Sequence, residues 1–318
     1  MIQAFGKELI KQAVELEAQD IYMIPKADDY DIYMRIGDER RFIDACDGSR
    51  MSGLISHFKF VAGMNVGEKR RSQLGSCDYE FSDDEGAAAL RLSTVGDYRG
   101  RESLVIRLLF DQRRQLQFWF DGLDQLLPEI VGRGLYLFSG PVGSGKTTLM
   151  YELVRRKYPN QQIITIEDPV EIKQEEMLQL QLNPSINMTY DSLIKLSLRH
   201  RPDVLIIGEI RDSQTAQAVI RASLTGITVF STVHAKSISG VYARMLELGI
   251  SQEELNNSLA GIAYQRLIGG GGVIDFAKEN FQNYGTGSWN HKIDRLFAAG
   301  HITEQQAADE KIADKPSA

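Results

Sequence analysis

Cysteine is scarce in this sequence, and so are long apolar runs. The shortage of each excludes some classes of protein. Only Cys46 and Cys77 occur among the 318 residues, and neither has a partner at the C-x-x-C spacing of a thiolate zinc site. No uninterrupted apolar run reaches the roughly 18 residues that a membrane-spanning helix needs. The first five residues also lack the basic start and apolar core of a secretory signal. We therefore expect a protein that stays inside the cell, with no structural zinc and no transmembrane segment.

Clustered positive charge is missing as well. The chain has 36 Lys and Arg against 43 Asp and Glu, a net charge of −7. Binding to the nucleic-acid backbone depends on grouped cations that release counterions, so this balance argues against direct contact with nucleic acid. Apolar residues at 43% and charged residues at 25% are ordinary for a globular protein. Any link to DNA or to a membrane is expected to be indirect.

The length and the hydrophobic pattern predict two domains and a tail. Apolar residues recur at helical spacing from Ile2 to Ala18, and alternating runs follow from Asp20 onward. With the β-type runs Ala88 to Val95 and Leu104 to Phe110, residues 1–112 are expected to form a small α+β domain. A linker with an entry helix is expected at 113–127.

The second half has the pattern of an α/β fold. Short apolar runs at 135–139, 163–166, 204–207 and 228–231 alternate with helical segments, which is typical of a mainly parallel sheet covered on both faces. We expect a RecA-like ATPase domain at 128–268 and a helical tail at 269–318. Gly269 to Gly272 is interpreted as the end of the last helix of the domain, and Thr303 with Gln306 as a capping box in the tail.

One motif carries the chemistry most clearly. The pattern G-x-x-x-x-G-K-[ST] lies between a predicted strand and a predicted helix, which is the context that a phosphate-binding P-loop requires. We expect its main-chain amides to surround the phosphates of ATP, Lys146 to reach the β- and γ-phosphates, and Thr147 to bind Mg²⁺. The candidate nucleotide-binding residues are Gly140, Pro141, Val142, Gly143, Ser144, Gly145, Lys146, Thr147 and Thr148.

Carboxylates follow two further predicted strands. Glu167 ends the run that begins at Ile163, and Glu209 follows the strand at 204–207. Strand ends in such sheets line the ligand crevice, where an acid can hold magnesium, directly or through water, or orient the attacking water. For the segment at Glu167, a solvated acidic turn ended by Pro169 is an equally good interpretation. Glu209 is the candidate catalytic base.

Two other groups are weaker candidates on the residues alone. His234 follows the fourth predicted strand and would be able to contact the γ-phosphate, although a lone histidine is more often structural. The P-loop segment contains no arginine, so the cation needed in the transition state must come from elsewhere. Arg91 and Arg107 lie on the two β-type runs of the first domain. Without further information, an ordinary basic surface is the better interpretation of these arginines.

The order of these motifs resembles the traffic ATPases of type II secretion and type IV pili. The resemblance covers roughly residues 2–267. It includes the segment Gln265-Arg266-Leu267 near its end, the P-loop and three further motifs. They are Glu-Asp-Pro-Val-Glu (167–171), Gly-Glu-Ile-Arg-Asp (208–212) and Ser-Thr-Val-His (231–234). The resemblance implies catalytic roles for Glu209, Glu167, His234, Arg91 and Arg107, and we include Arg211 of the second motif. It also implies a homo-hexamer that binds ATP between two lobes and acts on an inner-membrane platform protein.

Departures from the family pattern indicate a subgroup. Ile227 stands where the family has a histidine after Thr-Gly, and the four-cysteine zinc insertion is missing. The tail lacks the Ala-Ile-Arg-Asn-Leu-type motif of the retraction ATPases, and we expect no long extra domain before Ile2. A short, zinc-free chain is similar to the competence-pilus ATPases of Gram-positive bacteria.

These features predict a hexameric ATPase that powers assembly of a competence pilus for DNA uptake without binding DNA itself. It is expected in the cytoplasm, held at the inner face of the membrane by partners. A pilus-retraction or secretion ATPase is the close alternative. An ATP-binding scaffold with negligible turnover is a different one, disfavoured by intact Lys146 and Glu209, and a nucleic-acid motor is disfavoured by the acidic charge.

Overall fold

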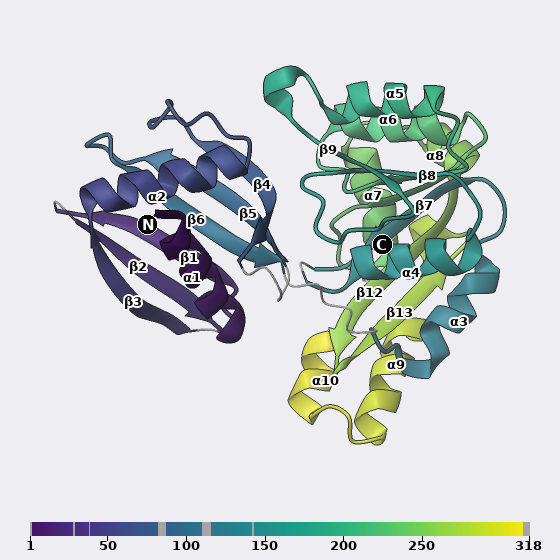
Figure 1. Ribbon diagram of the computed structural model, residues 1–318. Coiled ribbons are helices and arrows are strands. Elements are labelled where there is room, and N and C mark those ends of the chain that lie inside the picture. Colours follow the sequence, from purple (N-terminus) through teal and green to yellow (C-terminus); the bar gives the residue numbers. More distant parts are fainter. Residues whose placement is uncertain are drawn as a thin grey trace. The chain divides into compact units, whose positions relative to one another are not determined.

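The structure is a computed structural model that describes residues 2–27, 29–37, 39–81, 87–109, 116–141 and 143–313. It divides into two compact units, Met1–Arg113 and Arg114–Ala318, which are described separately (Figure 1). The predicted domain boundary at residue 112 and the predicted phosphate contact Val142 lie outside the described residues. None of the described helices combines the length and the hydropathy needed to cross a bilayer.

The first unit is a six-stranded antiparallel sheet with two helices. Its strand order is β3-β2-β1-β6-β5-β4. The elements are α1 (Ile2–Glu15), β1 (Asp20–Lys26), β2 (Asp29–Ile36), β3 (Glu39–Asp47), α2 (Gly48–Val61), β4 (Gln73–Glu80), β5 (Ala87–Gly96) and β6 (Glu102–Leu109). The predicted α+β class is confirmed. The sequence interpretation did not name β3, α2 or β4, which complete the sheet and its helical cover.

Both helices pack against one face of this sheet. Apolar side chains at helical spacing, such as Leu9 and Ile10 of α1 and Leu54 and Phe58 of α2, join inward residues of the strands in one core. Asp47 caps α2 by accepting from the amides of Ser49 and Arg50 at its start. The sheet and its two helices therefore share a single apolar interior.

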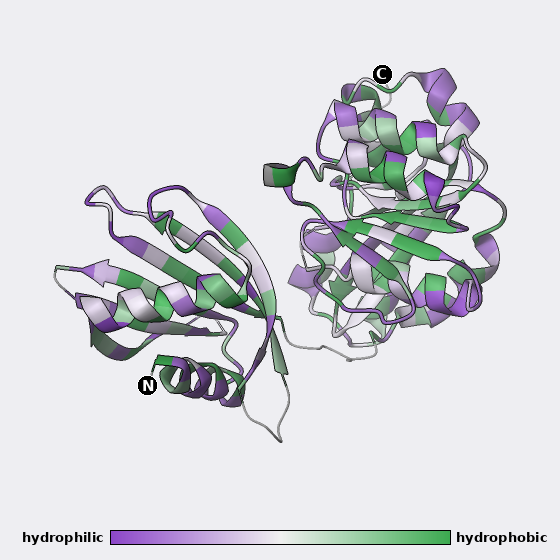
Figure 2. Ribbon diagram, turned by 45° about the horizontal axis from the view of Figure 1, so that its top comes forward, coloured by the Kyte–Doolittle hydropathy of each residue, from purple (hydrophilic) through white to green (hydrophobic). Residues whose placement is uncertain are grey.

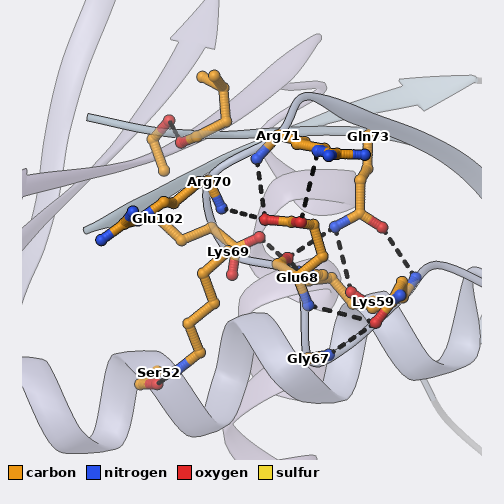
Figure 3. Close-up of polar contacts among 12 residues, drawn as sticks. Ser52, Lys59, Gly67, Glu68, Lys69, Arg70, Arg71, Gln73 and Glu102 are labelled. Atoms are coloured by element: carbon orange, nitrogen blue, oxygen red, sulfur yellow. Dashed lines mark hydrogen bonds and ion pairs between the residues drawn. The ribbon is translucent and has the colours of Figure 1, made fainter. Parts of the chain in front are cut away.

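A buried lysine connects α2 to β6 by an ion pair and to the loop before β4 by a hydrogen bond. Lys59 is fully buried and donates to Glu102 Oε1 at 2.5 Å and to the carbonyl of Glu68 at 2.6 Å. The carboxylate of Glu68 in turn accepts from the amides of Arg70 and Arg71 at 2.8 and 3.1 Å (Figure 3). These hydrogen bonds lower the pKa of Glu68. The loop is therefore tied to α2 and β6 by charged groups.

The second unit contains a seven-stranded sheet of order β13-β12-β7-β11-β10-β8-β9, parallel except for β13. Its strands are β7 (Gly134–Ser139), β8 (Ile163–Glu167), β9 (Leu178–Gln181), β10 (Val204–Ile207), β11 (Thr228–Thr232), β12 (Leu259–Ile268) and β13 (Gly271–Ala277). The helices are α3 (Gly122–Leu126), α4 (Lys146–Lys157), α5 (Tyr190–Arg199), α6 (Ser213–Ser223), α7 (Ile238–Glu247), α8 (Gln252–Ser258), α9 (Gly287–Ala298) and α10 (Glu304–Glu310). Short 3-10 turns lie at Trp119–Asp121, Leu127–Glu129, Pro184–Ile186 and Phe281–Asn283. The predicted parallel sheet is confirmed.

The sheet is buried on both faces, as its continuously apolar strands predict. Leu135 and Leu137 of β7 face a core shared with α5 to α9, whereas Tyr136 and Phe138 face a second core shared with α3 and α4. Figure 2 shows the apolar residues concentrated in the central strands and the polar ones on the outer helices. This burial fixes the positions of the strand ends, where the candidate site lies.

The expectation that Gly269 to Gly272 ends a helix is wrong. Residues 259–268 form strand β12, and Gly269 and Gly270, at φ of 58° and 84°, form the turn into β13. The two glycines suit the left-handed turn of a hairpin, which joins the antiparallel strands β12 and β13. Residues 271–277 of the expected helical tail form strand β13 instead. Beyond it the chain forms α9 and α10, and Thr303 and Gln306 form the expected capping box.

The tail is attached to β12 and α9 by polar contacts. Arg266 of β12 forms an ion pair with Glu310 at the end of α10. The indole of Trp289, itself buried, donates to the carbonyl of Glu310 at 2.8 Å. Asn290 of α9 also donates to the carbonyl of Ile312 at 2.9 Å. The last helix is therefore bound to the same strand that borders β7.

Candidate functional site

Four parallel strands deliver the candidate residues to one edge of the sheet. The strands β7, β11, β10 and β8 are neighbours in that order and run parallel. Their carboxyl ends carry the P-loop, His234, Glu209 and Glu167 respectively. Carboxyl ends of neighbouring parallel strands form the usual ligand crevice of such sheets. The structure therefore brings together the candidates of this unit.

The P-loop connects β7 to α4 through left-handed glycines. The φ angles of Gly140, Gly143 and Gly145 are 147°, 76° and 82°. Residues other than glycine rarely adopt these values. A Cβ on Gly140 would lie 2.1 Å from the carbonyl oxygen of Gln265 and 2.7 Å from Ser144 Oγ. Helix α4 begins directly after the loop at Lys146, so its free amides and positive end face the loop. The backbone is shaped to surround an anion.

Lys146 lies within the loop rather than extending into solvent. It is 9% exposed, and its Nζ donates to the carbonyls of Gly140 and Pro141 at 3.0 and 2.8 Å. Burial lowers its pKa, while the negative charges of Glu209 and Glu171 oppose that shift. A phosphate would offer this ammonium a stronger acceptor than two carbonyls.

Gln265 of β12 contacts the P-loop, although no motif assigned it a role there. Its side chain is 1% exposed, and Nε2 donates to the carbonyl of Ser144 at 2.7 Å. Its Oε1 and Ser144 Oγ are buried, and neither has a hydrogen-bond partner within the part of the chain that the structure describes. Position 265 lies far from the loop in sequence and belongs to no nucleotide-binding pattern. The signal in the sequence was the segment Gln265-Arg266-Leu267, which is part of the resemblance to the traffic ATPases but has no assigned role there.

Glu167 is buried and held by hydrogen bonds. It is 5% exposed, and its Oε1 accepts from the hydroxyls of Tyr151 and Thr165, both at 2.6 Å. The amide of Gln179 on β9 also donates to that oxygen at 3.3 Å. Burial raises the pKa of Glu167, and these donors oppose the rise. The acidic turn is thus not simply solvated, since this carboxylate is fixed between α4 and β9.

Glu209 lies in a cluster of charged side chains beyond β10. Its carboxylate is 18% exposed, pairs with Arg211 and lies 3.8 Å from Nε2 of His234. The hydrogen bond with Glu209 raises the pKa of Arg211, and Asp168 lies 3.9 Å from the same guanidinium. The structure therefore groups three predicted catalytic residues, and it adds Asp168 to them.

Main-chain and hydroxyl contacts hold the segment that carries Glu209. The hydroxyl of Thr232 on β11 donates to the carbonyl of Gly208 at 2.7 Å. The amide of Ile210 donates to the carbonyl of Thr232 at 2.8 Å. These bonds extend the pairing of β10 and β11 past the end of the strands, so Glu209 and His234 leave the sheet side by side.

Arg91 and Arg107 face each other on β5 and β6 of the first unit. The guanidinium of Arg107 donates from Nε to Asp20 Oδ1 at 2.7 Å, and its side chain is 58% exposed. Their role toward phosphate stays a prediction.

These features together define a P-loop ATPase: a glycine loop on a parallel strand, a lysine within it, and acids at the neighbouring strand ends. Residues 1–292 match the family described as type II/IV secretion system protein, and the chain belongs to that family. The resemblance found in the motifs is confirmed.

The relatives agree with this assignment. The chain is 62% identical to competence protein ComGA of Streptococcus pneumoniae (strain ATCC BAA-255 / R6), covering 98% of this chain and 99% of the relative. It is 37% identical to competence protein ComGA of Bacillus subtilis (strain 168), covering 84% and 76%. The crystal structure of the pilus retraction motor PilT with bound ADP has the same fold, with a TM-score of 0.75 at 23% identity, covering 98% and 97%.

Proposed function

We propose that this chain is the ATP-hydrolysing motor that drives assembly of a competence pilus for DNA uptake. The observation that carries the proposal is the placement of Lys146 in the P-loop after β7 and of Glu209 after β10, at the same edge of the sheet, in a chain 62% identical to ComGA. The likeness to ComGA extends over nearly the full length of both chains. This supports competence over a general secretion or retraction role.

The residues at the strand ends would share the work of hydrolysis. The P-loop amides and Lys146 bind the triphosphate, and Glu209 orients and deprotonates the attacking water. Mg²⁺ would be held by the hydroxyl of Thr147 together with Glu209 and Glu167, directly or through water, because hard cations prefer oxygen ligands, and it would neutralise charge on the phosphates. His234 lies close enough to Glu209 to contact the same water or the γ-phosphate. Arg211 holds Glu209 in place.

We further propose a homo-hexamer in which Arg91 and Arg107 supply positive charge to the γ-phosphate. The described P-loop and α4 offer no arginine before Arg155, and Arg211 is paired with Glu209, so we assign this charge to the first unit. An inner-membrane platform protein is the partner on which the ring acts, which places the ring at the cytoplasmic face of the membrane. Mass measurement of the purified protein with ATP and Mg²⁺ tests the hexamer, and a fully active monomer contradicts it.

The decisive experiment replaces the gene by its Glu209→Gln form and scores both DNA uptake and surface pili. An assembly motor loses pili and uptake together. A retraction motor keeps or gains pili while uptake falls. A scaffold with negligible turnover keeps both, because Gln at position 209 removes the base and leaves the P-loop intact.

A further inference from the structure

Gln265 is connected to the P-loop at two places. Its main-chain carbonyl lies beside Gly140, where it leaves no room for a Cβ at the start of the loop. Its side-chain Nε2 donates to the carbonyl of Ser144 at 2.7 Å, near the end of the loop. A Cβ on Gly145 would lie 3.0 Å from the same Nε2. One residue of β12 therefore touches both ends of the phosphate loop.

The contact with Ser144 has a consequence for the next amide. In a trans peptide the carbonyl and the following N–H lie in one plane and point in opposite directions. When Gln265 holds the Ser144 carbonyl on the β12 side, the N–H of Gly145 must point the other way, toward the interior of the loop. Amides at this part of a P-loop are donors to the α- and β-phosphates.

The local backbone does not by itself fix the orientation of the Gly145 N–H. Its φ of 82° is left-handed, a region that glycine enters and leaves at little cost. Among the residues that the structure describes, no side chain caps the start of α4. Among the described residues, the side chain of Gln265 is the one that donates a hydrogen bond to the Ser144 carbonyl. The glutamine is also nearly fully buried, so water does not compete for the bond.

We propose that Gln265 is a positioning residue for nucleotide binding, which turns the Gly145 amide toward the phosphates before the nucleotide arrives. The inference rests on the P-loop as a nucleotide site and not on pilus assembly. Because the amide contacts phosphate before and during hydrolysis, Gln265 contributes equally to binding of the ground state and of the transition state. Its loss is therefore expected to raise KM for ATP and to leave kcat nearly unchanged.

The test uses the full chain and two substitutions of similar length. Gln265→Met removes the donor, and Gln265→Glu sets a carboxylate against the Ser144 carbonyl. The dissociation constant of ADP, measured by calorimetry, is expected to rise about tenfold in the Met form, the effect of one lost hydrogen bond, and further in the Glu form. KM for ATP should rise in parallel, with kcat within about twofold of the native value.

Gln73→Met is the matched control. Gln73 also donates from Nε2 to a backbone carbonyl, that of Glu68 at 2.8 Å, but it belongs to the first unit (Figure 3). ADP affinity in this variant should be unchanged, and Lys146→Ala gives the reference for complete loss. Unchanged ADP affinity in both Gln265 variants overturns the proposal. So does a failure of both to fold, since Gln265 would then hold the sheet together rather than orient an amide.

Discussion

Arg107 and Asp20 form an ion pair in which the carboxylate is buried and the guanidinium side chain is exposed. Nε of Arg107 lies 2.7 Å from Oδ1 of Asp20, with side-chain exposures of 58% and 5%. Asp20 is thus inaccessible from outside, while the guanidinium it holds is half in solvent. Because Asp20 lies beneath Arg107, the ion pair holds the guanidinium in one orientation, directed toward solvent.

Asp20→Asn is expected to reduce ATP hydrolysis roughly tenfold, because an arginine that is poorly aimed stabilises the γ-phosphate less well. ADP affinity should not change, since the P-loop is untouched. Steady-state kinetics and calorimetry give the two numbers. Asp31→Asn is the control, because Asp31 is also little exposed and pairs with Lys26 on the same sheet. Equal kcat in all three proteins would show that Arg107 has no part in catalysis.

Glu209→Gln should lower kcat by about 100-fold or more, the usual contribution of a general base, while ATP still binds. The change removes the charge that Arg211 pairs with and keeps the size of the side chain. Glu247→Gln, which breaks an exposed pair with Arg244, provides the control. Phosphate release and nucleotide binding are measured on the same preparations. Native turnover in the position-209 variant would remove Glu209 from the mechanism.

Gly140→Ala is expected to destabilise the protein more than Gly132→Ala. Both glycines have positive φ, 147° and 81°, so both replacements strain the backbone. Only at Gly140 would the new Cβ meet a backbone carbonyl, at 2.1 Å, because nothing lies within 4 Å at Gly132. Denaturant unfolding compares the two, and nucleotide binding should fail in the first alone. Similar stability losses would mean that β12 moves aside easily.

The free energy of unfolding of the Glu167→Gln variant, relative to that of the native protein, should increase as the pH rises. Burial raises the pKa of Glu167 in the folded state, so the folded protein holds this proton more tightly than the unfolded chain does. The stabilisation from that proton is complete below the unfolded pKa and is lost as pH rises through the folded pKa. Gln has no charge to bury and keeps an oxygen for Tyr151 and Thr165. Melting curves of both proteins between acidic and neutral pH should therefore diverge, and parallel curves would contradict the prediction.

Lys59→Met should cost about 3–5 kcal/mol of unfolding free energy, because it leaves the buried carboxylate of Glu102 without its partner. It also removes the bond to the Glu68 carbonyl at 2.6 Å that fastens the following loop. Urea denaturation measures the loss. Lys195→Met, which breaks a pair that is 66% exposed on the lysine side, should have little effect. Comparable losses in the two variants would show that burial is not what makes this pair strong.

The sequence predicts those parts of the fold whose residues form a pattern within a short segment of the chain. The four apolar runs that form β7, β8, β10 and β11 are recognisable because a strand buried on both faces has no polar alternation. The P-loop is recognisable because its glycines and lysine are close together in sequence. The acids Glu167 and Glu209 are recognisable for a similar reason, since each directly follows one of these apolar runs.

Contacts that depend on distant segments could not be predicted in this way. Gln265 meets Ser144 across 121 positions of sequence, and Asp20 meets Arg107 across 87. The hairpin of β12 and β13 was mistaken for a helix because its glycine turn has the composition of a helix end. Tyr151 and Gln179, which fix Glu167, carry no pattern that separates them from surface residues.

Gln265 and Arg266 are consecutive residues of β12, so their side chains leave the strand on opposite sides. One holds the Ser144 carbonyl, and the other pairs with Glu310 of the last helix. A single peptide unit of β12 therefore joins the side chain that holds the Ser144 carbonyl to the side chain that pairs with α10. The P-loop and the last helix are thus anchored on neighbouring residues of one strand.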